Sequence, residues 1–127
     1  MKYLSIEDVL SLHDYMVDRY GGSVGVRDIG RLESVIASQS QEVFGQELYP
    51  TIYEKSAAIM RGIVQDHPFT DANKRSGTIC ATSLLEWNGF RISTELKELE
   101  DFAVRVAVEH LEIPEIAQWL ESHSRSN

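Results

Sequence analysis

The segment Thr51–Trp87, TIYEKSAAIMRGIVQDHPFTDANKRSGTICATSLLEW, decides the fold. It contains two helical patterns, one over about 51–65 and one that ends near Trp87, with a short polar stretch between them. Both patterns are apolar on most sides, through Ile52, Ala57, Ile59, Met60, Ile63 and Val64 in the first and Ile79, Cys80, Ala81, Leu84 and Leu85 in the second. Helices that are apolar nearly all round belong in the centre of a bundle. We therefore expect these two helices to form the core pair.

Amphipathic patterns with polar outer faces flank this segment. Ser5 and Asp8 suit the start of a helix that Gly21 and Gly22 end. The other expected elements are a helix from about Asp28, mostly loop over 39–50, an extended link over 90–93, a helix over 96–110 and a last helix after Pro114. Continuous strand-type alternation is absent. The sequence therefore predicts an all-α protein, a single compact bundle of about six helices with one domain over residues 1–127.

Composition narrows the function classes. Of 127 residues, 43% are hydrophobic and 25% charged, which is ordinary for a globular domain. The net charge of -8 disfavours direct binding of nucleic acid, which needs clustered bases. A single cysteine cannot form an internal disulfide, no apolar run is long enough to span a membrane, and the N-terminus is not a signal peptide. We expect a cytoplasmic protein without a membrane role.

The polar stretch between the two core helices, His67–Arg75 or HPFTDANKR, holds an unusual set of side chains for a simple turn. Helix N-termini expose N–H groups that suit phosphate oxygens, and small Ala72 and Asn73 would let a phosphate approach. Lys74 and Arg75 would supply the countercharge. The remaining expected roles are a Mg²⁺ ligand for Asp71, a proton acceptor for His67, and stiffening of the loop by Pro68 and Phe69.

Each of these side chains also has a structural interpretation. His67 could be a surface or capping histidine, and Asp71 an N-cap carboxylate. Asn73 could orient the loop instead of donating to a phosphate. Lys74 and Arg75 could be solvated charges, although cations in a first helical turn oppose the helix dipole. That mismatch favours a bound anion.

The order His-Pro-Phe-x-Asp-Ala-Asn-Lys-Arg resembles the signature of the Fic/Doc family, and is most similar to its Doc branch, the "death on curing" toxins. The segments LHDYMVDRYGG and GVRDIGRLESVI also resemble the start of Doc proteins. The resemblance implies a bundle of about six helices and transfer of a phosphate-containing group from ATP to a protein hydroxyl. It assigns His67 as the base, Asp71 as the Mg²⁺ ligand, and Ala72, Asn73, Lys74 and Arg75 to the phosphates.

Two departures from the Fic pattern affect the expected reaction. Thr78 stands where Fic adenylyltransferases usually carry a second Arg, and Lys74 replaces a Gly that lets the phosphates of ATP approach the backbone. In Doc proteins the same replacement accompanies a reversed nucleotide, which implies transfer of the terminal phosphate to a Ser or Thr. Adenylyl transfer, or a helical module that binds an anion or partner without catalysis, remain alternatives.

The family resemblance also implies partners. It suggests elongation factor Tu as the target, with a block of translation as the result, and inhibition by a Phd-like antitoxin whose flexible segment folds into a groove. The region that docks the target corresponds roughly to Tyr49, Pro50, Thr51, Ile52 and Tyr53, although the two tyrosines could equally pack against the core. Outside the motif, we expect His13 to be structural and Cys80 to be a buried hydrophobe.

Overall fold

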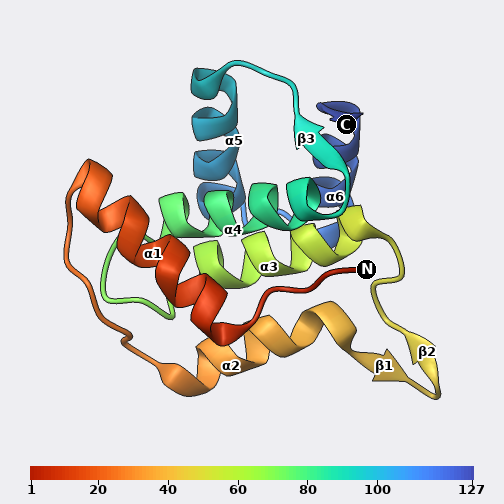
Figure 1. Ribbon diagram of the computed structural model, residues 1–127, viewed down its shortest axis with the longest axis horizontal. Helices are drawn as coiled ribbons and strands as arrows, with labels where there is room; N and C mark the ends of the chain where they lie inside the picture. The colour runs from red at the N-terminus through yellow and green to blue at the C-terminus, as the bar shows by residue number, and fades with distance from the viewer.

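In the computed structural model, which describes residues 1–127, six α-helices surround one core and the strands are short (Figure 1). The elements are α1 Ile6–Tyr20, α2 Ile29–Ala37, the 3₁₀ turn η1 Ser38–Ser40, β1 Glu42–Val43, β2 Gln46–Glu47, α3 Ile52–Asp66, α4 Asn73–Trp87, β3 Phe90–Ile92, α5 Leu96–Val108, α6 Ile113–Ser122 and β4 Ser124–Ser126. The predicted all-α class and the six helices are confirmed. No helix combines the length and apolar character that crossing a membrane requires.

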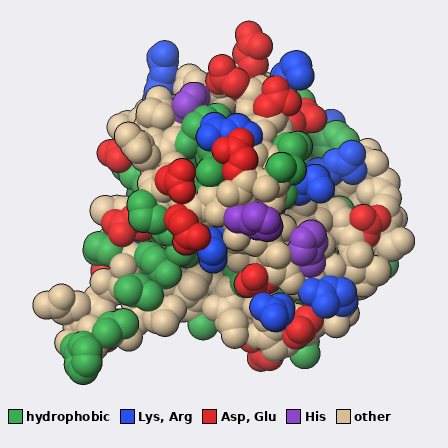
Figure 2. Space-filling view, turned by 180° about the vertical axis from the view of Figure 1, so that it is seen from behind, with side chains coloured by type: hydrophobic (Ala, Val, Ile, Leu, Met, Phe, Trp, Pro, Cys, Tyr) green, Lys and Arg blue, Asp and Glu red, His purple; other side chains and the backbone are tan.

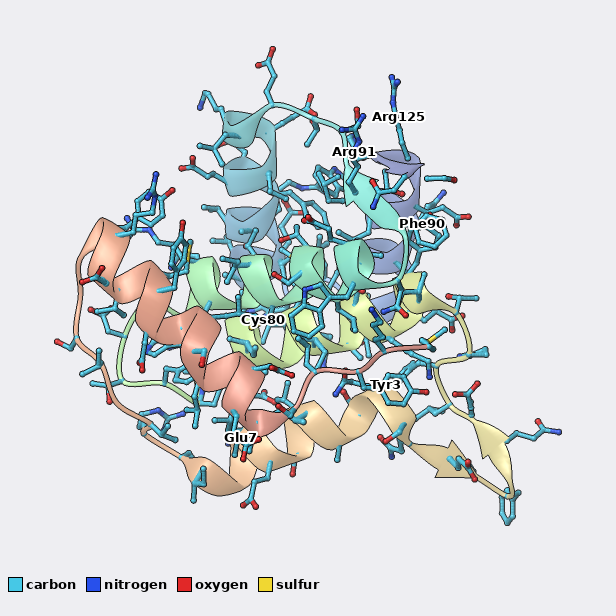
Figure 3. The ribbon with its side chains drawn as sticks, viewed as in Figure 1. Tyr3, Glu7, Cys80, Phe90, Arg91 and Arg125 are labelled. Carbon is cyan, nitrogen blue, oxygen red and sulfur yellow. The ribbon has the colours of Figure 1, made fainter.

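The core pair is α3 and α4, as predicted. They run side by side through the middle of the molecule (Figure 1), and most of their apolar side chains belong to one cluster of 22 buried residues. Close approach depends on Gly77, because a Cβ there would lie 2.7 Å from Val64 Cγ2 and 3.3 Å from the Met60 carbonyl oxygen. Cys80, labelled on α4 in Figure 3, is fully buried, as expected.

Capping explains where several helices begin and end. Ser5 and Asp8 form a reciprocal capping box at the start of α1, and Gly21, with φ of 91°, follows its last residue. Asp28 and Thr51 accept hydrogen bonds from the first turns of α2 and α3. The fifth helix is shorter than predicted, because α5 ends at Val108 and His110 adopts a left-handed φ of 51° that turns the chain towards α6.

Two antiparallel ribbons connect the helices. The expected loop over 39–50 contains most of η1 and the hairpin β1–β2, whose tip residue Phe44 is fully exposed. The hairpin protrudes from the molecule at the lower left of Figure 2. The expected extended link over 90–93 becomes β3, which pairs with the C-terminal strand β4 and places Arg91 opposite Arg125 (Figure 3). The β3–β4 pairing joins segments far apart in sequence, and the hairpin strands are only two residues long, so local periodicity revealed neither ribbon.

A buried lysine ties the hairpin to the N-terminal end of α3. Lys55 is 1% exposed, and its ammonium donates to the Gln39 carbonyl oxygen at 2.6 Å and to Glu47 Oε1 at 2.8 Å. The same ammonium lies 5.3 Å from the ring centroid of Tyr3, which Figure 3 shows near the C-terminal end of α2. The buried ammonium of Lys55 thus has its hydrogen-bond partners within the chain, which offsets the cost of removing its charge from water.

Candidate active site

The candidate site is the connection from α3 to α4, residues 67–72, called here the catalytic loop. Two of its residues have left-handed backbone conformations, His67 with φ of 52° directly after α3 and Ala72 with φ of 61° directly before α4. Such conformations cost free energy for residues other than glycine and persist where surrounding contacts enforce them. The loop is therefore held in shape by its neighbours.

One neighbour is the connection between α1 and α2, residues 21–28, called here the strap. The backbone N–H groups of Arg27 and Asp28 donate to the Pro68 carbonyl oxygen at 2.8 and 3.0 Å, and Thr70 N–H donates to the Gly25 carbonyl oxygen at 3.0 Å. Val26 forms an isolated antiparallel bridge with Phe69. The strap therefore lies along the catalytic loop as a short partner strand.

A second support reaches the loop from α4. The Asn73 side chain accepts a hydrogen bond from Phe69 N–H at 3.0 Å, and its amide donates to the Phe69 carbonyl oxygen at 3.1 Å. Asn73 is itself buried. Of the two side-chain roles considered for Asn73, orientation of the loop is the one these contacts show.

A third support comes from α1, below the loop. Phe69 is fully buried and stacks on the His13 ring, with centroids 3.8 Å apart and an angle of 4° between the planes. His13 Nδ1 lies 2.7 Å from the Ser76 hydroxyl oxygen. The structural roles expected of Phe69 and His13 fit these contacts, but no spacing in the sequence indicated that His13 supports the catalytic loop.

Asp71 carries the negative charge of the loop. One oxygen accepts a hydrogen bond from Ala72 N–H at 2.8 Å and the other from Ser23 N–H at 3.1 Å. These backbone bonds, Ala72 first, hold the pKa of Asp71 below its usual value, so the carboxylate is charged at neutral pH. The carboxylate is exposed and keeps lone pairs for a cation.

The residues around Asp71 bear on the expected magnesium ion. No group of three or more His, Cys, Asp or Glu side chains lies together anywhere in the chain, so the protein alone builds no metal cage. Mg²⁺ commonly binds one or two carboxylates together with water and substrate phosphates. Asp71 therefore fits a magnesium ion that arrives with a nucleotide.

The first turn of α4 has the properties of an anion site. The N–H groups of Asn73, Lys74 and Arg75 have no acceptor within the chain, and this turn contains no acidic residue. Lys74 and Arg75 are exposed and form no ion pair with a carboxylate. The only contacts of the Arg75 guanidinium are with Tyr20, at 3.4 Å from its carbonyl oxygen and 5.4 Å from its ring centroid.

The remaining members of the motif differ in exposure. His67 is exposed, and its imidazole makes no hydrogen bond within the chain, so it is free to meet a substrate hydroxyl. Pro68 is buried and anchors the loop together with Phe69. Thr78 donates its hydroxyl hydrogen to the Lys74 carbonyl oxygen at 2.8 Å. This neutral side chain stands at the position where the resemblance places the second arginine of Fic adenylyltransferases.

A groove of about 310 Å³ adjoins the two cations of the anion site. It lies between the end of α1, the start of α4 and one side of α5, and is lined by Met16, Tyr20, Lys74, Arg75, Thr78, Leu96, Leu99, Glu100, Ala103 and Val104. Leu96 is 65% exposed and Val104 47% exposed. An apolar surface therefore meets the positive edge of the site.

The segment expected to dock a target lies at the opposite end of α3. Tyr49 and Pro50 precede this helix and Thr51 caps it, whereas His67 follows its last residue, so the 15-residue helix separates them by about 20 Å. Ile52 is buried, and Tyr53 packs on Phe90 with ring centroids 5.4 Å apart. Tyr49, Thr51 and Tyr53 also line a groove of about 560 Å³ against α6. Docking of a target there stays a prediction.

Comparison with known proteins agrees with this geometry. The model of the Fic/DOC family matches residues 3–85, which include the strap, the catalytic loop and nearly all of α4. This chain belongs to the Fic/DOC family. It is 31% identical over 121 residues to the protein named Toxin Doc of Mycolicibacterium smegmatis, covering 94% of this chain and 91% of that protein. It is 32% identical over 120 residues to Protein kinase doc of Escherichia phage P1, covering 94% of each.

Some residues of this Fic/DOC site escaped the sequence reasoning. Arg27, Ser23 and His13 all contact the catalytic loop, yet they lie 40 or more residues before it. The segments that contain His13 and Arg27 resembled the start of Doc proteins, whereas Ser23 lies between those two segments. The local pattern predicted a structural role for His13 but no contact with this loop, and it assigned no role to Arg27 or Ser23.

Proposed function

We propose that this chain is a Doc-like toxin that transfers the terminal phosphate of ATP to a Ser or Thr hydroxyl of a protein, with elongation factor Tu as the target and a block of translation as the result. The observation that carries the proposal is the first turn of α4, where two cations without carboxylate partners and three unpaired N–H groups adjoin a loop with a free imidazole. The relatives named Toxin Doc and Protein kinase doc support it. The Lys74 side chain, where Fic adenylyltransferases have Gly, favours the phosphoryl outcome.

In the proposed reaction, the oxygen of the target hydroxyl bonds to the γ-phosphorus of ATP while His67 accepts the proton of that hydroxyl. The bond from that phosphorus to the bridging oxygen breaks, and ADP leaves. Lys74, Arg75 and the backbone N–H groups of α4 neutralise the phosphate oxygens and orient the nucleotide. Asp71 would hold a magnesium ion, which supplies further positive charge to the phosphates when bound. Protein groups here act by positioning and charge.

Labelled ATP distinguishes the proposed reaction from adenylyl transfer. Elongation factor Tu incubated with this protein and Mg-ATP should gain label from the γ-phosphate and a phosphoryl group by intact mass. A gain of label from the α-phosphate would instead identify an adenylyltransferase. No adduct from either position would favour the non-catalytic module.

A His67→Ala variant is the matched control for this assay. Because the His67 side chain is exposed and unbonded, the variant should keep its melting temperature. Loss of a general base lowers rates by about 10²- to 10⁴-fold, so the phosphoryl adduct should nearly vanish. Equal activity of the variant would remove His67 from the mechanism.

A Phd-like antitoxin is the proposed partner, and the groove beside Lys74 and Arg75 is its proposed seat. A segment that folded into this groove would cover apolar surface on α5 and place side chains beside the two cations. Co-expression of such an antitoxin should relieve growth arrest. Val104→Glu, which puts a charge on the exposed wall of the groove, should restore the arrest.

A further inference from the structure

The last carbonyl groups of α3 have an unusual partner in Arg27 of the strap. Its Nε donates to the His67 carbonyl oxygen at 2.7 Å, and its Nη2 donates to the Asp66 carbonyl oxygen at 2.9 Å. One guanidinium thus binds two successive peptide groups. These are the peptide groups on either side of the His67 Cα, and that residue has the left-handed φ of 52°.

The guanidinium of Arg27 is committed to these two carbonyls. It forms no ion pair with any carboxylate, and the nearby Asp66 carboxylate pairs instead with Arg31 at 3.8 Å. The backbone N–H of Arg27 donates to the Pro68 carbonyl oxygen at 2.8 Å. Side chain and backbone of one residue therefore bind three successive carbonyl groups, those of Asp66, His67 and Pro68.

The chemistry of this contact requires arginine. A planar guanidinium presents donors in a fixed fork, whereas a lysine ammonium is a point charge on a flexible stem. A cation at this place also interacts favourably with the C-terminal dipole of α3. Because Arg27 is exposed and contributes nothing to the buried core, its contacts serve the conformation of the loop more than the stability of the fold.

We infer that Arg27 is a positioning residue that fixes the backbone of His67 and thereby aims the imidazole at the anion site on α4. The catalytic part of this inference rests on the proposed function. Without the two hydrogen bonds, His67 can relax from its left-handed conformation, which changes the direction of its side chain. A displacement of about 1 Å can lower a rate by roughly 100-fold.

The test compares Arg27→Lys and Arg27→Gln with a matched control, Arg31→Gln. Arg31 lies one helical turn further on, is also exposed, and contacts only the carboxylates of Asp28 and Asp66. We expect both Arg27 variants to stay folded and to lose about 10- to 100-fold in kcat, with the KM for ATP unchanged. Arg31→Gln should keep the kcat of the unmodified chain. An Arg27→Lys variant with full kcat, or equal losses in all three variants, would overturn the inference.

A measurement independent of catalysis separates this inference from the proposed function. In NMR spectra of the unmodified chain and of Arg27→Gln, the resonances of His67 and Phe69 should shift or broaden, while those of α6 stay in place. If the unmodified chain transfers no phosphate, the proposed function fails, and these spectra still decide whether Arg27 fixes the loop. Unchanged His67 resonances in Arg27→Gln would overturn the inference even in an active enzyme.

Discussion

Positive side chains are paired and buried near one end of α3, and exposed and unpaired beyond the other. At the N-terminal end, Lys55 is buried, and its ammonium is satisfied by Glu47, by a backbone carbonyl and by the ring of Tyr3. Beyond the C-terminal end, Lys74 and Arg75 are exposed and have no carboxylate partner, although the chain carries 20 acidic residues against 12 basic ones. In an acidic protein, unpaired cations next to unpaired backbone N–H groups indicate a place kept for an anion.

The supports at the two ends differ in the same sense. Near the N-terminal end of α3, the Gln39 side chain accepts a hydrogen bond from Leu4 N–H and donates one to the Leu4 carbonyl oxygen, each at 2.8 Å. The polar groups around this end of the helix therefore bind one another. Around the catalytic loop, the strap, Asn73 and the His13–Phe69 stack hold the backbone while the side chains of His67, Lys74 and Arg75 stay free. Polar side chains at one end are paired within the chain, whereas at the other end the backbone is held and the side chains remain available to a ligand.

Among the variants that compare the two ends of α3, the largest expected effect concerns Lys74. If its bulk and charge set the orientation of the nucleotide, Lys74→Gly should lose phosphoryl transfer and gain adenylyl transfer. Hydrogen bonds to charged groups are worth about 1.5–3 kcal/mol, so γ-phosphate transfer should fall by roughly 10- to 150-fold. Transfer from α- and γ-labelled ATP measures both reactions. Unchanged γ-transfer would show that Lys74 does not orient the nucleotide.

The variants Lys55→Met and Lys74→Met compare how much each lysine contributes to the free energy of unfolding. Lys55→Met leaves the Gln39 carbonyl oxygen without its donor in a buried place, which should lower the free energy of unfolding by about 2 kcal/mol. Lys74→Met removes an exposed, unpaired charge and should leave that free energy within about 0.5 kcal/mol. Urea denaturation of both variants decides the point. A larger loss from Lys74→Met would reverse the roles assigned to the two ends.

A smaller effect concerns pH and the imidazole below the catalytic loop. Burial lowers the pKa of His13 from its usual 6.5, against the opposing influence of Asp14 and Asp71. Because the folded pKa lies below the unfolded one, the unfolded chain binds the proton more readily as the pH falls below about 6.5. The free energy of unfolding should therefore decrease as the pH falls from about 7 towards the folded pKa.

His13→Phe isolates this contribution, because phenylalanine can keep the stack on Phe69 but does not titrate. Denaturation curves between pH 5 and about 7.5 should show a weaker dependence on pH for this variant. His110→Asn, at an exposed left-handed position, is the control and should retain the dependence. An unaltered slope in His13→Phe would contradict the assignment.

The smallest expected signal comes from the middle of the core pair, between the two ends. Burial raises the pKa of Cys80 to about 12, and the residue is fully buried. Its thiol should resist a thiol reagent in the folded chain and react as the chain unfolds. Rapid labelling of the folded protein would show that α3 and α4 separate at the level of Cys80.

Local chemistry made much of the fold predictable. The uniformly apolar patterns of α3 and α4, the capping by Ser5, Asp8 and Gly21, and the turn beginning at His67 depend on residues close in sequence. The strands of the hairpin over 42–47 are two residues long, too short for a periodic pattern, and the pairing of β3 with β4 depends on partners that only the folded chain brings together. The C-terminal end of α5 was misplaced because the apolar spacing continues to His110, whereas the backbone reverses there.

The order of residues His67–Arg75 by itself determined which chemical groups stand at the candidate site, namely an imidazole, a carboxylate and two cations next to a helix start. Only the tertiary structure decided how those groups are held. Arg27, Ser23 and His13 reach the catalytic loop from α1 and the strap, and no spacing in the sequence encodes that contact. The spacing of apolar residues follows from the geometry of a helix and can be found in the sequence. The contacts that support a strained loop form only when distant segments pack around one core.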